Sequence, residues 1–239
     1  MMNMLRRFIN NKYFYLWSII LILVLYMFYG FFHASVANYM LWNQIEDNEM
    51  YIFYVYTLPM AFSNVNYMFC ILLDVLYMTI LLYPSVSFVD YFFNENSTTS
   101  MTRISRNRWI DEFISVNLLC SVIISAIYIL LYYILGNIHD YEIILEFNSL
   151  NNFLPIIYKT IISCIVPITY IYAYIKTDNA GLSLGFSIFV NIILQIIIKI
   201  SFDVKKLYFG NSIYTILIFI VLYLLLRSLS IKSFKRRDI

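Results

Sequence analysis

Six long apolar runs dominate the chain and set what it can fold into. An α-helix rises 1.5 Å per residue, so about 20 apolar residues cross a hydrocarbon core of about 30 Å. The runs that reach this length cover residues 13–32, 67–89, 113–135, 156–175, 181–200 and 212–229. A seventh stretch, residues 50–62, is shorter and contains Pro59, which favours an interfacial or re-entrant segment. The pattern predicts an all-α, polytopic membrane protein with six transmembrane helices.

Composition supports lipid as the solvent. The chain of 239 residues is 62% hydrophobic and 13% charged, against about 45–50% and about 25% in soluble domains. These values exclude a water-soluble enzyme, a disordered chain and a secreted disulfide scaffold. The net charge of +2 is too small to predict binding to nucleic acid.

The basic residues predict how the runs are oriented. If the N-terminus lies inside, twelve of the 16 Lys and Arg residues fall on the inner side. The predicted outer loops, residues 33–66 and 136–155, contain no Lys or Arg, and Lys159, Lys199, Lys205 and Lys206 alone lie toward the outside. Because cytoplasmic loops retain Lys and Arg, both termini are predicted to be cytoplasmic.

Basic residues lie near both ends of the chain. Residues 1–12 place apolar side chains at helical spacing, namely Met1, Met4, Leu5 and Phe8, with Arg6 and Arg7 on another face. This pattern predicts an amphipathic helix in the headgroup layer. Residues 230–239 are expected to form a basic cytoplasmic tail.

The predicted inner loop, residues 90–112, holds the most structured polar sequence. Glu95 precedes five residues of the types that cap helix N-termini, residues 96–100. A short helix over residues 101–109 is therefore expected, with Arg103 and Arg106 one turn apart on one face. Such a helix can dock into a protein groove. The alternative is that these Arg residues only fix topology and bind anionic headgroups.

A few polar and small residues interrupt the apolar runs. Asp74 is the only acid deep in any run, so it predicts either a proton or substrate site or an interior hydrogen-bonding role. Asn191 and Gln195 share one helix face and either bond across helices or line a cavity. Gly181 and Gly185 form a G-x-x-x-G, which allows close helix approach within the chain or between two protomers.

Motifs for covalent or nucleotide chemistry are missing from the sequence. There is no phosphate-binding G-x-x-x-x-G-K-[ST], no G-x-S-x-G, no S-x-x-K and no H-E-x-x-H. We therefore expect no catalytic residue, no metal site and no enzymatic activity in this chain.

The arrangement as a whole resembles the type-2 ABC exporter permeases. In the inner loop, Glu95, Thr98-Thr99 and then Arg103-Ile104-Ser105-Arg106 are similar to the family's acidic residue, small-residue turn and Ser-Arg. The ending, residues 234–239, is similar to the family's aromatic, basic, Asp and aliphatic close. The chain lacks the Gly that the family often has in the turn, and its segment 201–211 is shorter than the family's re-entrant helices.

The resemblance implies one permease domain over residues 1–239 that is driven by a separate ATPase. The inner loop would be a coupling helix seated on that ATPase, with Glu95, Thr98, Met101, Arg103, Ile104, Arg106 and Trp109 as coupling residues. ATP and Mg²⁺ would bind to the partner. Two permease chains, identical or different, would pair through the first and fifth spans, which places Gly181 and Gly185 at the contact.

Chain size, short loops and many Tyr and Phe residues favour an amphipathic or hydrophobic cargo, such as an antimicrobial or toxin peptide that is exported or expelled for resistance. Two alternatives remain at this point. One is a stand-alone membrane protein that confers bacteriocin immunity without ATP, and the other is a secondary carrier.

Overall fold

The computed structural model describes residues 67–90, 106–138, 154–201 and 209–235, together with single residues between Lys12 and Tyr26. Within these ranges every residue except Asp178 and Asn179 is helical. The prediction of an all-α protein is therefore confirmed for the part of the chain that the structure describes.

Five long helices follow the predicted runs closely. They are α4 (Tyr67–Asp90), α6 (Arg106–Ile138), α7 (Leu154–Thr177), α8 (Ala180–Ser201) and α9 (Phe209–Lys235). Four of them, α6 to α9, are long and apolar enough to cross a membrane, and α4 contains a shorter apolar segment, Ile71–Ser87. The count of six spans and the cytoplasmic placement of both termini stay predictions.

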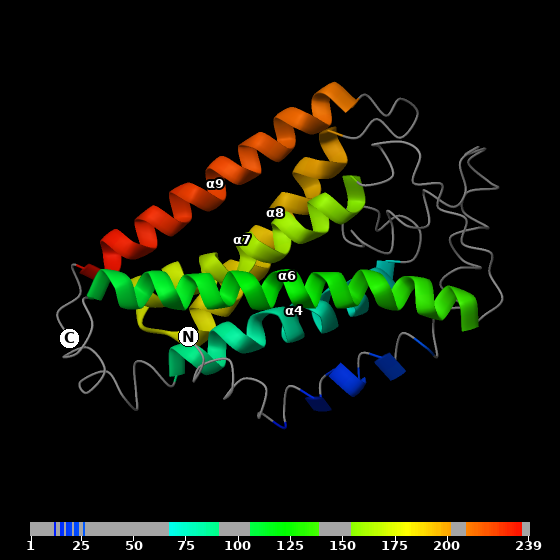
Figure 1. The fold of residues 1–239 in the computed structure, drawn as a ribbon, viewed down its shortest axis with the longest axis horizontal. Coiled ribbons are helices and arrows are strands. Elements are labelled where there is room, and N and C mark those ends of the chain that lie inside the picture. The colour runs from blue at the N-terminus through cyan, green and yellow to red at the C-terminus, as the bar shows by residue number, and fades with distance from the viewer. Residues whose placement is uncertain are drawn as a thin grey trace.

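Helix α7 is the centre of the bundle. It packs against α4, α6, α8 and α9 (Figure 1). In its apolar span 72% of residues are buried, against 17% in α9. Large side chains fill the interior around it, including Tyr77 of α4, Phe113 of α6 and Phe219 of α9. The helix therefore connects elements that are far apart in sequence.

The exposed surface of the helices is apolar, while many polar residues are buried. Ile and Leu side chains such as Leu130, Ile200 and Leu217 are more than half exposed. Asp74, Lys159 and Gln195 are each at most 5% exposed. Water-soluble proteins rarely expose apolar surface on this scale, so the distribution fits a protein whose solvent is lipid.

Two helices extend beyond their predicted ends. Helix α6 has 33 residues, a length of about 50 Å, and includes Arg106 to Trp109 as its first turn. No Pro or Gly interrupts the sequence from Arg106 to Leu135, so the helix does not break at Trp109, where the predicted short inner helix ended. Helix α9 likewise continues to Lys235, so residues 230–235 of the predicted tail are helical.

The connection between α7 and α8 is a two-residue turn. Asp178 has φ of 53°, and its N–H donates to the Tyr174 carbonyl at 2.9 Å, which closes α7. Asn179 Oδ1 accepts a hydrogen bond from the Leu182 N–H at 3.1 Å and so caps α8. The two helices therefore form a tight hairpin.

Candidate functional site: a buried polar cluster beside a groove

The Asp74 carboxyl group on α4 is held by two side-chain amides of α8. Asn191 Nδ2 donates to Asp74 Oδ2 at 2.6 Å, and Gln195 Nε2 donates to Asp74 Oδ1 at 3.0 Å. Gln195 Nε2 also lies 3.3 Å from Asn191 Oδ1. The structure thus brings together the three polar residues that the sequence singled out within the spans, and each of the two carboxyl oxygens has its own donor.

Lys159 supplies a buried cation at the same level of the bundle. Its Nζ lies 3.6 Å from the centre of the Tyr77 ring and 4.6 Å from the centre of the Tyr128 ring. Electrostatic attraction also links Lys159 to Asp74. A lysine on α7 is therefore enclosed by the faces of two tyrosines, from α4 and α6, rather than by water.

The tyrosine ring over Lys159 is itself fixed by α7. The hydroxyl groups of Tyr77 and Ser163 share a hydrogen bond, and Ser163 Oγ donates to the Lys159 carbonyl at 2.6 Å. We call Asp74, Tyr77, Tyr128, Lys159, Ser163, Asn191 and Gln195 the buried polar cluster. Its members come from four helices: hydrogen bonds join α4 to α8, and a hydrogen bond and ring contacts join α4 and α6 to α7.

The buried polar cluster lies toward one end of the bundle. Lys159 is five residues from the start of α7, and Gln195 is six residues from the end of α8, which corresponds to about 8 and 9 Å along the helices. Asp74 is seven residues from the start of α4. The predicted orientation puts this layer in the outer half of the membrane.

A long groove runs between α4 and α8 beside the cluster. It has a volume of about 460 Å³. Its α4 wall extends from Ile71 to Val86 and its α8 wall from Leu184 to Ile192. Among the described lining residues Asp74 is the one carboxylic acid, none is Lys, Arg or His, and Thr79 and Tyr83 add hydroxyl groups. A smaller cavity of about 220 Å³ lies on the other side of α4, lined in part by Tyr15, Tyr77 and Tyr128.

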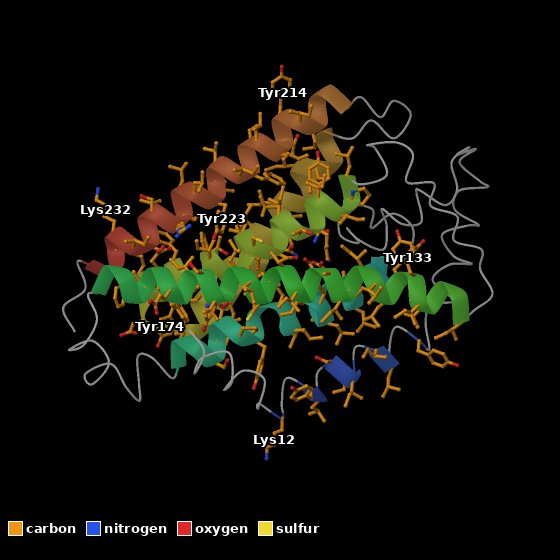
Figure 2. All side chains as sticks on the ribbon, in the orientation of Figure 1. Lys12, Tyr133, Tyr174, Tyr214, Tyr223 and Lys232 are labelled. Atoms are coloured by element: carbon orange, nitrogen blue, oxygen red, sulfur yellow. The ribbon has the colours of Figure 1, made fainter. Side chains whose placement is uncertain are left out.

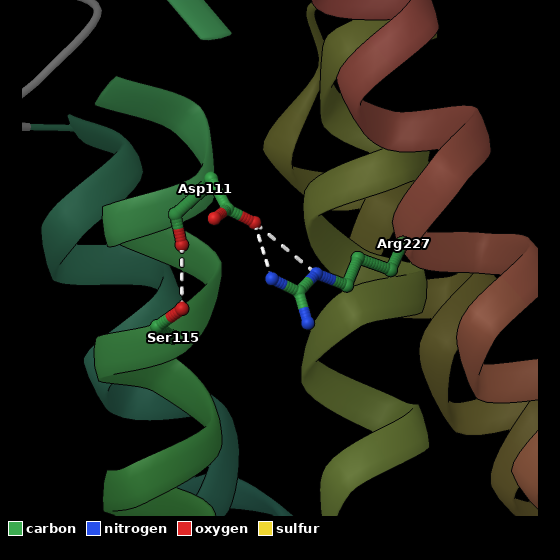
Figure 3. A network of polar contacts seen from close by, with 3 residues as sticks. All are labelled: Asp111, Ser115 and Arg227. Carbon is green, nitrogen blue, oxygen red and sulfur yellow. Dashed lines mark hydrogen bonds and ion pairs between the residues drawn. The ribbon is translucent and has the colours of Figure 1, made fainter. Parts of the chain in front are cut away.

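At the opposite end, an ion pair joins α6 and α9. Arg227 reaches from α9 to the carboxylate of Asp111 near the start of α6 (Figure 3). Arg227 Nε lies 3.2 Å from Asp111 Oδ1, and the Nη2 atom bonds to the same oxygen. The side chains are 36% and 46% exposed, respectively, so the pair lies at the edge of the bundle. It ties the first turns of α6 to the end of α9.

The two glycines of α8 differ in their surroundings. A Cβ atom at Gly181 would lie 3.3 Å from Asn179 Oδ1, the atom that caps α8. Among the residues that the structure describes, a Cβ atom at Gly185 would meet nothing within 4 Å, and Gly185 is exposed. No described helix therefore packs closely against Gly185. A contact between two protomers stays a prediction.

The predicted coupling residues are described only in part. Arg106 and Trp109 lie in the first turn of α6, continuous with the span. The other residues proposed for coupling lie outside the described ranges, namely Glu95, Thr98, Met101, Arg103 and Ile104. Residues 1–11 of the predicted amphipathic helix and residues 236–239 of the tail also lie outside them.

Sequence reasoning missed Lys159 as a site residue. It was predicted only to lie toward the outside, and its burial, at 2% exposure, was not predicted. A second missed feature is a stripe on α8 that repeats every four residues: Ser183, Ser187, Asn191 and Gln195. All four are buried, at 0–2% exposure. The four-residue period was present in the sequence and marks the face of α8 that packs inward.

Comparison with known proteins gives no match. Neither a protein-family model, nor a curated protein, nor a solved structure matches the chain. Its function is therefore inferred from its own residues and their geometry.

Proposed function

We propose that the chain is the membrane-spanning subunit of an ATP-driven exporter of the type-2 ABC class in a bacterial plasma membrane. The chain hydrolyses nothing itself. A separate cytoplasmic ATPase binds ATP and Mg²⁺, and a second permease chain completes the path of an amphipathic or hydrophobic cargo such as an antimicrobial peptide.

The observation that carries the proposal is the continuity of α6. Arg106 and Trp109 belong to the proposed coupling segment, and they continue without a break into a helix that reaches Ile138. A push on this end is transmitted along a rigid rod rather than through a loop. The Arg227–Asp111 pair extends the same connection to α9.

The central position of α7 supports the same proposal. A displacement of α6 or α9 bears directly on α7, which also packs against α4 and α8. Movement of the inner ends of the helices therefore reaches the buried polar cluster, whose members lie on α4, α6, α7 and α8. A shift between inward-open and outward-open populations requires a mechanical connection of this kind.

The test is purification of the full chain with candidate ATPase subunits. We expect an ATPase to co-purify, and we expect the double variant Arg103→Glu/Arg106→Glu to lose both the ATPase and cargo transport. The control is Lys232→Glu, which reverses one positive charge, as each of the two substitutions does, at an exposed position near the end of α9 (Figure 2). Normal transport by the double variant would contradict the proposal.

A secondary carrier is the second candidate, and the buried polar cluster favours it. An ionisable pair inside a membrane bundle is the arrangement used by proton-coupled carriers. Transport that continues without any ATPase, stops when the proton gradient is collapsed and is abolished by Asp74→Asn would establish this alternative. ATP-driven transport that is unaffected by an uncoupler would exclude it.

A further inference from the structure

We propose that the groove between α4 and α8 binds an amphiphile that carries a primary amine, with its tail along the groove and its amine against Asp74. This inference deepens the proposed function, because it names the chemical class of the cargo. The two features of the groove that carry it are the largely apolar walls and the one carboxyl group, that of Asp74.

The groove has the length of an alkyl tail. Its α4 wall runs from Ile71 to Val86, sixteen residues, or about 22 Å along the helix. One leaflet of a hydrocarbon core is about 15 Å thick, so the groove holds a tail of the length found in membrane lipids. The opposing α8 residues are Leu184, Ile188 and Ile192, which offer only aliphatic contacts.

Asp74 gives the groove its chemical selectivity. It is 5% exposed and lines the groove near one end. Its two oxygens accept from neutral amides at 2.6 and 3.0 Å, and a carboxylate has about four acceptor sites in all. An amine in the groove can therefore add a charge-assisted hydrogen bond without displacing Asn191 or Gln195.

Lys159 does not occupy this position. Its ammonium lies over the rings of Tyr77 and Tyr128, and among the described residues the hydrogen-bond donors to Asp74 are the two amides. An amine in contact with the carboxylate would lie closer to it than Lys159 does. Its attraction to Asp74 would therefore be stronger than that of Lys159, because Coulomb energy falls with distance.

The test is native mass spectrometry of the full chain in detergent, titrated with octadecylamine. We expect saturable binding of one molecule per chain. Octadecanol and octadecanoic acid have the same tail without the amine. We expect the affinity of each to be lower by a factor of about ten or more, because a hydrogen bond to a charged group contributes about this factor. Equal binding of octadecanoic acid would overturn the proposal.

Two variants separate the amine contact from the tail contact. Asp74→Asn is expected to bind octadecylamine as weakly as the wild type binds octadecanol. Ile188→Trp is expected to fill the groove and weaken binding of both the amine and the alcohol. Unchanged octadecylamine binding by either variant would overturn the proposal.

The matched control is Ile193→Trp. Ile193 is on the same helix and is 38% exposed against 44% for Ile188, but it does not line the groove. We expect wild-type binding from it, and an equal loss in both tryptophan variants would show nonspecific partitioning and overturn the proposal. No ATPase is present in this assay, so its failure is distinct from a failure of the co-purification test.

Discussion

The Lys159 ammonium lies 3.6 Å from the centre of the Tyr77 ring, inside a bundle whose outer surface is apolar. Tyr77 is three residues beyond Asp74 on α4, so the same turn of that helix presents an aromatic face to the cation and a carboxyl group to the amides of α8. In the buried polar cluster Asp74 thus contacts neutral amides and Lys159 contacts aromatic rings, and no ion pair between the two is found among the described residues.

Because Asp74 and Lys159 compensate each other's buried charge, the effects of their substitutions on the free energy of unfolding are expected to be strongly coupled. Removing one buried charge leaves the other uncompensated, so Asp74→Asn and Lys159→Met are each expected to destabilise the fold by about 3–5 kcal/mol. The double variant is expected to lose much less than the sum. Unfolding of all four proteins in the same detergent gives the double-mutant cycle. Additive losses would mean that the two charges do not compensate each other.

The contacts of Tyr77 predict that its ring matters more than its hydroxyl group. Tyr77→Phe removes the hydrogen bond with Ser163 and is expected to cost about 1 kcal/mol. Tyr77→Leu also removes the ring over Lys159 and is expected to cost at least about 2 kcal/mol more. Thermal unfolding of the two variants side by side measures the difference. Equal losses would assign the whole effect to the hydroxyl group.

The Arg227–Asp111 pair is expected to contribute little to stability. Both side chains are more than a third exposed, so Arg227→Gln should cost at most about 1 kcal/mol and less at high salt. If the pair connects α6 to α9 during transport, the same variant lowers cargo-stimulated ATPase activity while leaving the unfolding midpoint nearly unchanged. The charge-swapped double variant Asp111→Arg/Arg227→Asp should recover activity. A swap that recovers nothing would argue against this role.

The hairpin turn between α7 and α8 gives a pair of opposite predictions. Asn179→Ala removes the cap on α8 and is expected to cost about 1 kcal/mol. Asp178→Gly replaces a residue with positive φ by the one that adopts this conformation without strain, so stability is expected to stay level or rise. Unfolding midpoints of both variants test this, and destabilisation by Asp178→Gly would show that the Asp178 side chain stabilises the turn.

Substitution of Gly185 is expected to change the assembly of the protein without changing its fold. A Cβ atom there meets no atom of the described helices, so Gly185→Ile should leave the unfolding midpoint unaltered. If two protomers pack at this glycine, the variant is expected to shift the purified protein from dimer to monomer in sedimentation. A dimer that persists would place the contact elsewhere.

The sequence predicted the extent of the helices well, because bilayer thickness sets the length of an apolar run. The predicted run 156–175 and the observed α7, Leu154–Thr177, differ by two residues at each end. The start of α6 was not predicted, since the cap-like residues 96–100 favoured a separate short helix before the third run. The helix propensity of residues 106–109 is compatible with a separate short helix or with an earlier start of α6. The structure has the earlier start, in one continuous helix.

Three members of the buried polar cluster were predicted as candidates, but their connections were not. Asp74, Asn191 and Gln195 each stood out as polar residues in apolar runs, but which helices are neighbours and how each is rotated cannot be read from single-run hydropathy. The burial of Lys159 was not predicted for the same reason. The count of basic residues along the chain reports position along the membrane normal, and the burial of Lys159 depends on which side of α7 it occupies.

The two-residue connection between α7 and α8 has a consequence for biogenesis. Asp74 on α4 is costly to insert alone, and the amides that bind it belong to α8. Because only Asp178 and Asn179 separate α7 from α8, the two helices can enter the bilayer as one unit, after α4 has already been synthesised. Lengthening this turn would leave folding of the finished protein possible but would leave the Asp74 carboxyl group without its amide partners for longer, and quality-control proteolysis would act during that interval.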